Sequence, residues 1–237
     1  MLGRFLEVSV AAADVPASLA FYESLGFVQA PTGDARRWPY AVVTDGRLSL
    51  GLHAAGVAEP TLTWVRPAVA LHAERIESLG IELEYLRLGP EELHEIGFRD
   101  PSGQLVSIVE ARTFSPPSSP PPASQLGWFE EFGVPTTDLA RSASWWDALG
   151  LVAFEPVNRP FPRASAAARD LNLGLYDIDL RAPVLVYSDP AMPARIAELR
   201  ERGHRFAPRL PRGLDPHEHA LLEAPEGTWL LLATGLE

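Results

Sequence analysis

The chain has 237 residues, of which 46% are hydrophobic and 22% charged, a composition typical of a folded globular protein with one large or two small domains. It contains no cysteine and no lysine, which excludes disulfides, thiolate chemistry and lysine-bound cofactors. The net charge of −11 argues against nucleic acid as a partner. No apolar run has the length of a membrane helix, and the first residues lack the pattern of a signal peptide, so we expect a cytoplasmic protein without a membrane partner.

The first predicted elements are a strand and a helix. Residues 5–10 alternate, with the aliphatic even-numbered side chains on one face and the odd-numbered ones, including Glu7 and Ser9, on the other. Asp14 stands where an N-cap is expected, and Gly26 is expected to end the helix that follows.

The remainder of the first half repeats this pattern. Residues 47–53 and 104–110 alternate as strands do, and the second of these follows a turn at 100–103. Between them, residues 68–79 form an amphipathic pattern closed by Gly80, which predicts a second helix. The half is therefore interpreted as two modules of the form βαβββ.

A proline-rich segment divides the chain into two parts of nearly equal length. Residues 113–125 read TFSPPSSPPPASQ, and prolines without amide donors cannot join a helix interior or a sheet ladder. We therefore predict a domain at 1–112, a linker at 113–125 and a second domain at 126–237.

The two parts are copies of each other. DVPASLAFYESLGF begins at Asp14 and DLARSASWWDALGL at Asp138, and their matching residues are 124 positions apart. LSLGL at 48–52 matches LNLGL at 171–175 with an offset of 123. Such constant spacing over the whole length indicates a tandem duplication, so the second half should repeat the elements of the first.

The motif D-x-x-x-S-x-x-F-Y-x-x-L-G-F, followed later by F-R-D-P-S-G-Q-L, resembles the vicinal oxygen chelate superfamily. That superfamily includes glyoxalase I, extradiol dioxygenases, epimerases and the bleomycin- and fosfomycin-resistance proteins. The resemblance implies an α+β fold in which four βαβββ modules form two glyoxalase-like domains with curved mixed sheets shaped like cups. Which modules pair to form each cup stays open, since module one could pair with module two or with module four.

The resemblance also implies where a metal would bind. Metal-dependent members carry ligands on the first and usually the fourth strand of each module, and Glu7 and Glu131 occupy the first-strand positions here. The other positions hold Ser49, Thr61 and Ser107 in the first half and Asn172, Val184 and Leu231 in the second. Hydroxyl and alkyl groups are poor ligands for transition metals. We therefore expect no cofactor, with a divalent metal as the alternative.

Candidate site residues follow from these strands. Glu7 and Glu131 are candidate acids or bases facing the cups, although a structural role satisfied by neighbours is the competing interpretation. The candidate ligand-binding residues are Ser9, Ser49, His53, Thr61, Thr63, Ser107, Asn172, Tyr176 and Trp229. His217 and His219 would face the same way on a strand, and with a nearby carboxylate they form an alternative metal pair.

Two functions of different classes remain. The depleted ligand set favours a protein that binds a small, possibly aromatic, molecule in a cup, and Trp229 would provide an aromatic wall. The alternative is a metal-dependent lyase, isomerase or dioxygenase that uses Glu7 or Glu131, although the His, His, Glu set of a dioxygenase is missing. A purely structural descendant is a third interpretation. Because fused copies often replace a homodimer, we expect a monomer or a weak homodimer.

Overall fold

A computed structural model describes residues 1–32, 36–111 and 124–235 of the chain. Residues 113–123 of the predicted linker lie outside these ranges. Over the described part, the strands form two mixed β-sheets. Strands and four α-helices alternate along the chain in the order expected of a repeated βαβββ pattern, except for one strand of the last module. None of the helices in these ranges combines the length and the apolar character that crossing a membrane requires.

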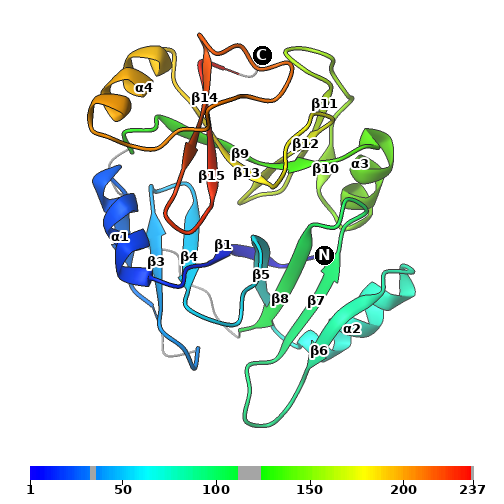
Figure 1. Cartoon of the computed structure of the whole chain (residues 1–237). Coiled ribbons are helices and arrows are strands. Elements are labelled where there is room, and N and C mark those ends of the chain that lie inside the picture. Colours follow the sequence, from blue (N-terminus) through cyan, green and yellow to red (C-terminus); the bar gives the residue numbers. More distant parts are fainter. Residues whose placement is uncertain (33–35, 112–123, 236–237) are drawn as a thin grey trace.

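The first half forms one eight-stranded sheet in the order β2-β3-β4-β1-β5-β8-β7-β6 (Figure 1). Its first module consists of β1 (Arg4–Ala11), α1 (Val15–Ser24), β2 (Val28–Ala30), β3 (Tyr40–Thr44) and β4 (Ser49–His53). Its second module consists of β5 (Thr61–Arg66), α2 (Val69–Ser78), β6 (Leu83–Arg87), β7 (Glu95–Arg99) and β8 (Leu105–Glu110). Both modules match the predicted βαβββ pattern.

The second half forms a seven-stranded sheet in the order β10-β11-β12-β9-β13-β15-β14. Its third module consists of β9 (Trp128–Pro135), α3 (Leu139–Ala148), β10 (Val152–Ala153), β11 (Arg163–Ala167) and β12 (Asn172–Tyr176). The fourth consists of β13 (Val184–Ser188), α4 (Met192–Glu201), β14 (His219–Glu223) and β15 (Trp229–Ala233).

The fourth module has two strands after its helix where three were predicted. The missing strand is reduced to a single bridge between Phe206 and Leu222. The following segment contains Pro208, Pro211 and Pro216, which cannot donate to a ladder. This segment, residues 207–216, forms a loop instead, and its Leu214 packs in a hydrophobic cluster with side chains of the sheet.

Strand pairing shows which modules combine. β1 pairs with β5 and β9 pairs with β13, both antiparallel, so module one joins module two and module three joins module four. The predicted α+β fold with two curved mixed sheets is confirmed, and the pairing that the sequence left open is the sequential one.

Both halves begin their first helix in the predicted way. The Asp14 side chain accepts a hydrogen bond from the Ala17 amide at 3.0 Å, and Asp138 accepts one from the Arg141 amide at the same distance. These are N-caps. Gly26 follows α1 with a positive φ of 91°, a conformation that side chains other than glycine rarely adopt.

A bulge in β1 corrects one predicted orientation. Phe5 was expected on the same face as Glu7, but the β1–β5 register shifts between these two residues. The extra residue, Leu6, turns Phe5 to the opposite face, where its ring packs edge-on against Trp64 at 5.2 Å. The β9–β13 pairing shifts at the duplicate position, so both first strands are bulged just before their glutamate.

The two halves share one hydrophobic core, and Figure 1 shows α1 and α3 on opposite sides of the molecule where the sheets meet. Tyr22 of α1 donates from its hydroxyl to Glu226 of the other half at 2.7 Å. Reciprocally, Trp146 of α3 donates from its indole to Asp100 of the first half at 3.2 Å. Because Tyr22 and Trp146 are duplicate positions, each helix donates to an acid in the final turn of the other half, although Glu226 and Asp100 occupy different positions of that turn.

Candidate functional site

Each sheet has one face covered by helices and one that carries the duplicated glutamate, here called the first cup (Glu7) and the second cup (Glu131). Strand register places three residues in a row across each cup. In the first, Glu7 lies beside Thr63 and Thr63 beside Ser107. The duplicate row is Glu131, Val186 and Leu231. The row beside the acid therefore carries hydroxyls in the first cup and aliphatic side chains in the second.

A glycine lies beneath each glutamate. A Cβ atom built on Gly51 would collide with the Glu7 carboxylate, and one built on Gly174 would collide with that of Glu131 and with the Tyr176 ring. These are the glycines of the duplicated LSLGL and LNLGL motifs. The motif was a usable sequence signal for the site, because a glycine inside a strand often marks a place of close approach.

The buried His53 holds Glu7 in the first cup through a fixed tautomer. The Trp38 indole, which can only donate, lies 3.2 Å from His53 Nδ1, so this ring nitrogen accepts and carries no proton. His53 Nε2 therefore carries the proton and donates to Glu7 Oε1 at 2.8 Å. Tyr40 stacks on the imidazole at 5.2 Å with an interplanar angle of 8°.

Two hydroxyls complete the shell around Glu7. Ser9 donates to Glu7 Oε1 at 2.7 Å, and since its only proton is used there, Thr63 must donate in the 2.9 Å bond to Ser9. Glu7 is 3% exposed and His53 is 1% exposed. The first glutamate is therefore enclosed, and its hydrogen-bonding partners are side chains of the protein itself.

A second buried acid in the first cup, Glu95, was missed by the sequence analysis. It accepts hydrogen bonds from Ser107 at 2.7 Å, from Tyr85 at 3.2 Å and from Arg87 at 3.0 Å, and Arg36 lies 3.8 Å away. Burial, and then the Glu95 charge, raise the pKa of the Tyr85 phenol. Of the four partners of Glu95, only Ser107 is among the predicted site residues. The four partners come from three segments that are distant in the sequence, which no local pattern connects.

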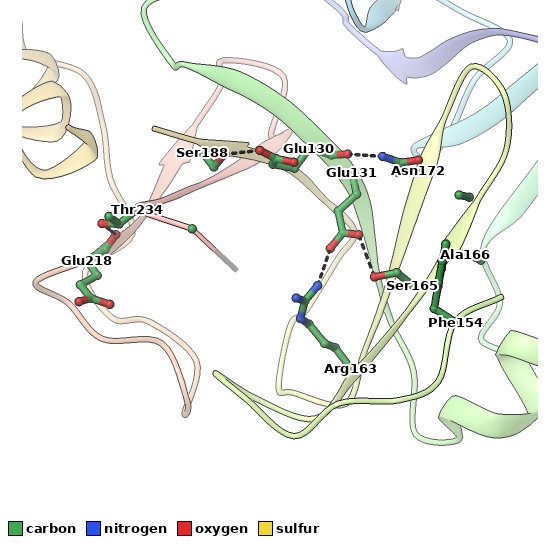
Figure 2. A pocket seen from close by; sticks show the side chains of 12 residues that line it. Glu130, Glu131, Phe154, Arg163, Ser165, Ala166, Asn172, Ser188, Glu218 and Thr234 are labelled. Atoms are coloured by element: carbon green, nitrogen blue, oxygen red, sulfur yellow. Dashed lines mark hydrogen bonds and ion pairs between the residues drawn. The ribbon is translucent and has the colours of Figure 1, made fainter. Parts of the chain in front are cut away.

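Glu131 in the second cup has different partners (Figure 2). Tyr176, the duplicate of His53, donates to its Oε1 at 2.5 Å, and Ser165 donates to Oε2 at 3.4 Å. Arg163 Nη1 lies 3.6 Å from Oε1. Burial raises the pKa of the Glu131 carboxyl, although the Tyr176 bond and the Arg163 charge act in the opposite direction.

Glu131 lines an open cavity of about 710 Å³, here called the polar cavity. Its walls also include Arg163 and Ser165 from β11 and Asn172 from β12, and Figure 2 shows Glu131 pointing toward the first two. The lining is completed by Glu130, Phe154, Ala166, Ala167, Ser188, Glu218, Thr234 and Gly235. Of the predicted site residues, Glu131 and Asn172 line this cavity; Arg163 and Ser165 were missed, since β11 carries no motif.

The opposite end of the second cup is apolar. A separate hydrophobic cluster fills its middle, and its members include Tyr176, Val186, Leu231 and Leu214 of the loop 207–216. Beyond this cluster, Trp229 lines another cavity of about 460 Å³, here called the tryptophan cavity. Trp229 therefore does not lie with Glu131, although both belong to the same cup.

The remaining predicted residues lie elsewhere. Thr61 is not the residue beside Glu7 on the fifth strand. It pairs with Ser9 and donates to the Glu59 carbonyl, while Thr63 pairs with Glu7. Ser49 is half-buried at the start of β4 and makes none of the hydrogen bonds that surround Glu7.

The premise of the histidine pair is wrong. His217 is exposed in a turn that precedes β14, whereas His219 begins the strand and is buried, with its Nδ1 directed to the Asp215 carbonyl at 3.1 Å. The two imidazoles therefore do not project from one strand face.

The side chains of the cups do not fit a divalent metal. Within the described ranges, no three His, Cys, Asp or Glu side chains gather closely enough to hold an ion. The row neighbours of Glu7 are hydroxyls and those of Glu131 are aliphatic, while a guanidinium stands 3.6 Å from Glu131. The Arg163 cation opposes metal binding at Glu131, and in the first cup both ring nitrogens of His53 are already used in hydrogen bonds to Trp38 and Glu7.

Solved structures share the fold over nearly the whole chain. Homoprotocatechuate 2,3-dioxygenase from Arthrobacter globiformis superposes with a TM-score of 0.63 and 14% identity, covering 99% of this chain and 80% of that one. The 2,2',3-trihydroxybiphenyl 1,2-dioxygenase from Sphingomonas wittichii gives 0.60 and 15%, covering 99% and 91%. A catechol 2,3-dioxygenase gives 0.57 and 16%, covering 100% and 88%.

At the level of sequence, no protein-family model and no curated protein matches the chain. Identities near 15% establish architecture and leave the chemistry to the site. The chain therefore has the fold of the vicinal oxygen chelate superfamily, to which the extradiol dioxygenases belong.

Proposed function

We propose that the protein binds a small polar organic molecule in the polar cavity of the second cup, without a catalytic metal. The observation that carries this proposal is the position of Glu131. Glu131 is 5% exposed yet lines a cavity of about 710 Å³, a size common for small-molecule sites. The duplicate acid, Glu7, is enclosed by its own neighbours.

The lining defines what the ligand must present. Glu131 accepts hydrogen bonds and Arg163 can only donate them, while Ser165 can do both. A ligand with a donor and an acceptor a few ångströms apart, such as a hydroxy acid or an amino acid, satisfies this arrangement. Phe154 is 54% exposed and lines the same cavity, so it offers an apolar contact beside the polar groups.

A thermal-shift screen of hydroxy acids, amino acids and polyols tests this function. A ligand at about one hundred times its Kd stabilises the folded protein by about 2.7 kcal/mol, which is readily measured as an increase in Tm. We expect Glu131→Gln to abolish the increase in Tm, because the amide keeps the shape of the acid but loses the negative charge that strengthens hydrogen bonds from the ligand.

Glu7→Gln is the matched control, since it makes the same change at the duplicate position. It should lower the Tm of the free protein and leave the ligand-induced increase intact. A screen without stabilising compounds would contradict the proposed function. So would a ligand whose effect is lost in Glu7→Gln and retained in Glu131→Gln.

Ring-cleaving dioxygenase activity is a second candidate, and the fold comparisons favour it, because the superposed structures named above are dioxygenases. The side chains around Glu131 count against dioxygenase activity, because Arg163 lies beside the carboxylate and the described residues contain no group of three metal-ligating side chains. Incubation of protein with ferrous iron and catechol, followed by measurement of oxygen consumption, separates the two. We expect no consumption above that of iron alone; oxygen uptake that is lost in Glu131→Gln would establish the dioxygenase function.

A further inference from the structure

The tryptophan cavity differs from the polar cavity in position and chemistry, and the two share no lining residue. It lies at the ends of β13 and β15 where Val184 pairs with Trp229, whereas Ser188, at the other end of β13, lines the polar cavity. The apolar cluster around Val186 and Leu231 lies between them. A ligand in one cavity therefore does not occupy the other.

Most residues that line this cavity are apolar. Trp229 is partly exposed and lines the space, with Val184 and Leu221 on the same sheet. Leu210 and two prolines of the loop 207–216 form the facing wall. This wall exists because the fourth module lost a strand to its prolines. An indole opposite aliphatic groups suits a planar hydrophobic ring.

Two arginines give the cavity a positive rim. Arg181 and Arg209 line it from two different loops, both exposed, and neither forms an ion pair or a side-chain hydrogen bond with another described residue. Asp179 is the only acid among the lining residues. The rim thus has a net charge of +1 in a chain whose net charge is −11. This local reversal favours an anionic ligand.

We propose that the tryptophan cavity is a second binding site, specific for a flat aromatic carboxylate whose ring stacks on Trp229 and whose anionic group lies between Arg181 and Arg209. Guanidinium groups match carboxylates in charge and in hydrogen-bond geometry. The proposal goes beyond the function assigned to the polar cavity and does not depend on it.

Isothermal titration with naphthalene-1-carboxylate and its neutral counterpart naphthalene-1-methanol tests this site. We expect the carboxylate to bind one per chain, about tenfold more tightly than the alcohol. Substituting both arginines, Arg181→Gln with Arg209→Gln, should remove this preference and leave the alcohol unchanged. Because both side chains are exposed, the variant should fold normally.

Further variants locate the bound ring. Trp229→Ala should lower the affinity for both compounds about tenfold, and Trp229→Phe, which keeps an aromatic surface, should retain most of the native affinity. Glu131→Gln should leave the affinity for both naphthalene compounds unchanged, which distinguishes this site from the polar cavity. Equal affinity for carboxylate and alcohol, an arginine variant that binds like the native chain, or loss of binding in Glu131→Gln would overturn the proposal.

Discussion

The two cups hold the same acid in opposite circumstances. Glu7 receives its hydrogen bonds from His53 and Ser9 and is sealed inside the first cup, while Glu131 receives them from Tyr176 and Ser165 and lines an open cavity. The backbone positions are identical, down to the bulge before each acid and the glycine beneath it. Duplication therefore preserved the scaffold, while different neighbouring side chains enclose one acid and leave the other beside a cavity.

The difference arises from what covers each acid. In the first cup, Trp38 donates to His53, the partner of Glu7, and Arg36 lies 3.8 Å from Glu95, so the segment that holds both residues contacts the surroundings of both buried acids. In the second, an apolar cluster fills the middle of the cup and leaves space at both ends. A buried acid that accepts hydrogen bonds from the protein contributes to stability, whereas an acid that lines a cavity can be reached by a ligand.

The largest expected effect separates the two acids by stability. Glu7→Ala leaves the His53 N–H and the Ser9 hydroxyl buried without their acceptor, so we expect a loss of about 3 to 5 kcal/mol in the free energy of unfolding. Glu131→Ala should cost about 1 kcal/mol, because water in the cavity can replace the carboxylate. Urea denaturation of both variants measures the difference, and equal losses would show that the cups are equivalent.

The glycine beneath Glu7 should be nearly as sensitive. Gly51→Ala places a methyl group where the carboxylate lies, and Glu7 has no free space to move into, so we expect a loss of about 1 to 3 kcal/mol. Gly235→Ala is the matched control, since a Cβ there meets no atom within 4 Å. The same denaturation curves test both, and an unchanged Gly51→Ala would show that Glu7 is not held in place.

Reciprocal contacts between the halves should contribute less. Tyr22→Phe removes the hydroxyl that donates to Glu226, while Ser18 still donates to the same carboxylate at 2.8 Å. We expect a loss of about 1 kcal/mol in unfolding free energy and a single cooperative transition, because one core spans both halves. Calorimetry measures this; two separate transitions in the variant would contradict the shared core.

The smallest effect is a dependence on pH. Burial raises the pKa of Glu131 in the folded state above its unfolded value, so its contribution to stability is present below the ordinary carboxyl pKa of about 4.3 and is lost as pH rises through the folded pKa. Glu131→Gln removes this titration. As pH rises above about 4.3, the unfolding free energy of the native chain should therefore fall relative to that of Glu131→Gln. A difference between the two free energies that does not change with pH would contradict the raised pKa.

Sequence patterns predicted those features that depend on neighbouring residues. Alternation located β1, Asp14 and Gly26 marked the ends of α1, and the constant offset revealed the duplication. The same comparison matched His53 with Tyr176, and both residues do contact the duplicated acid. Alternation failed at Phe5 because a bulge adds one residue and reverses the faces before it.

Features that join distant segments could not be predicted in this way. Glu95 is separated from Arg36 by 59 positions and Arg163 from Glu131 by 32, and no local pattern indicates that such pairs meet. The prolines of the loop 207–216 were visible, but only the fold shows that this loop packs onto the second cup and forms a wall of the tryptophan cavity.

The sequence by itself therefore determined the modules, their repetition and the two acids, since periodicity, caps and turns act over a few residues. The tertiary structure alone decided which modules pair, which acid is enclosed and where cavities remain. Those outcomes depend on strand register and on side chains from four or more segments packing together, and the free energy of such contacts is set by their surroundings in space.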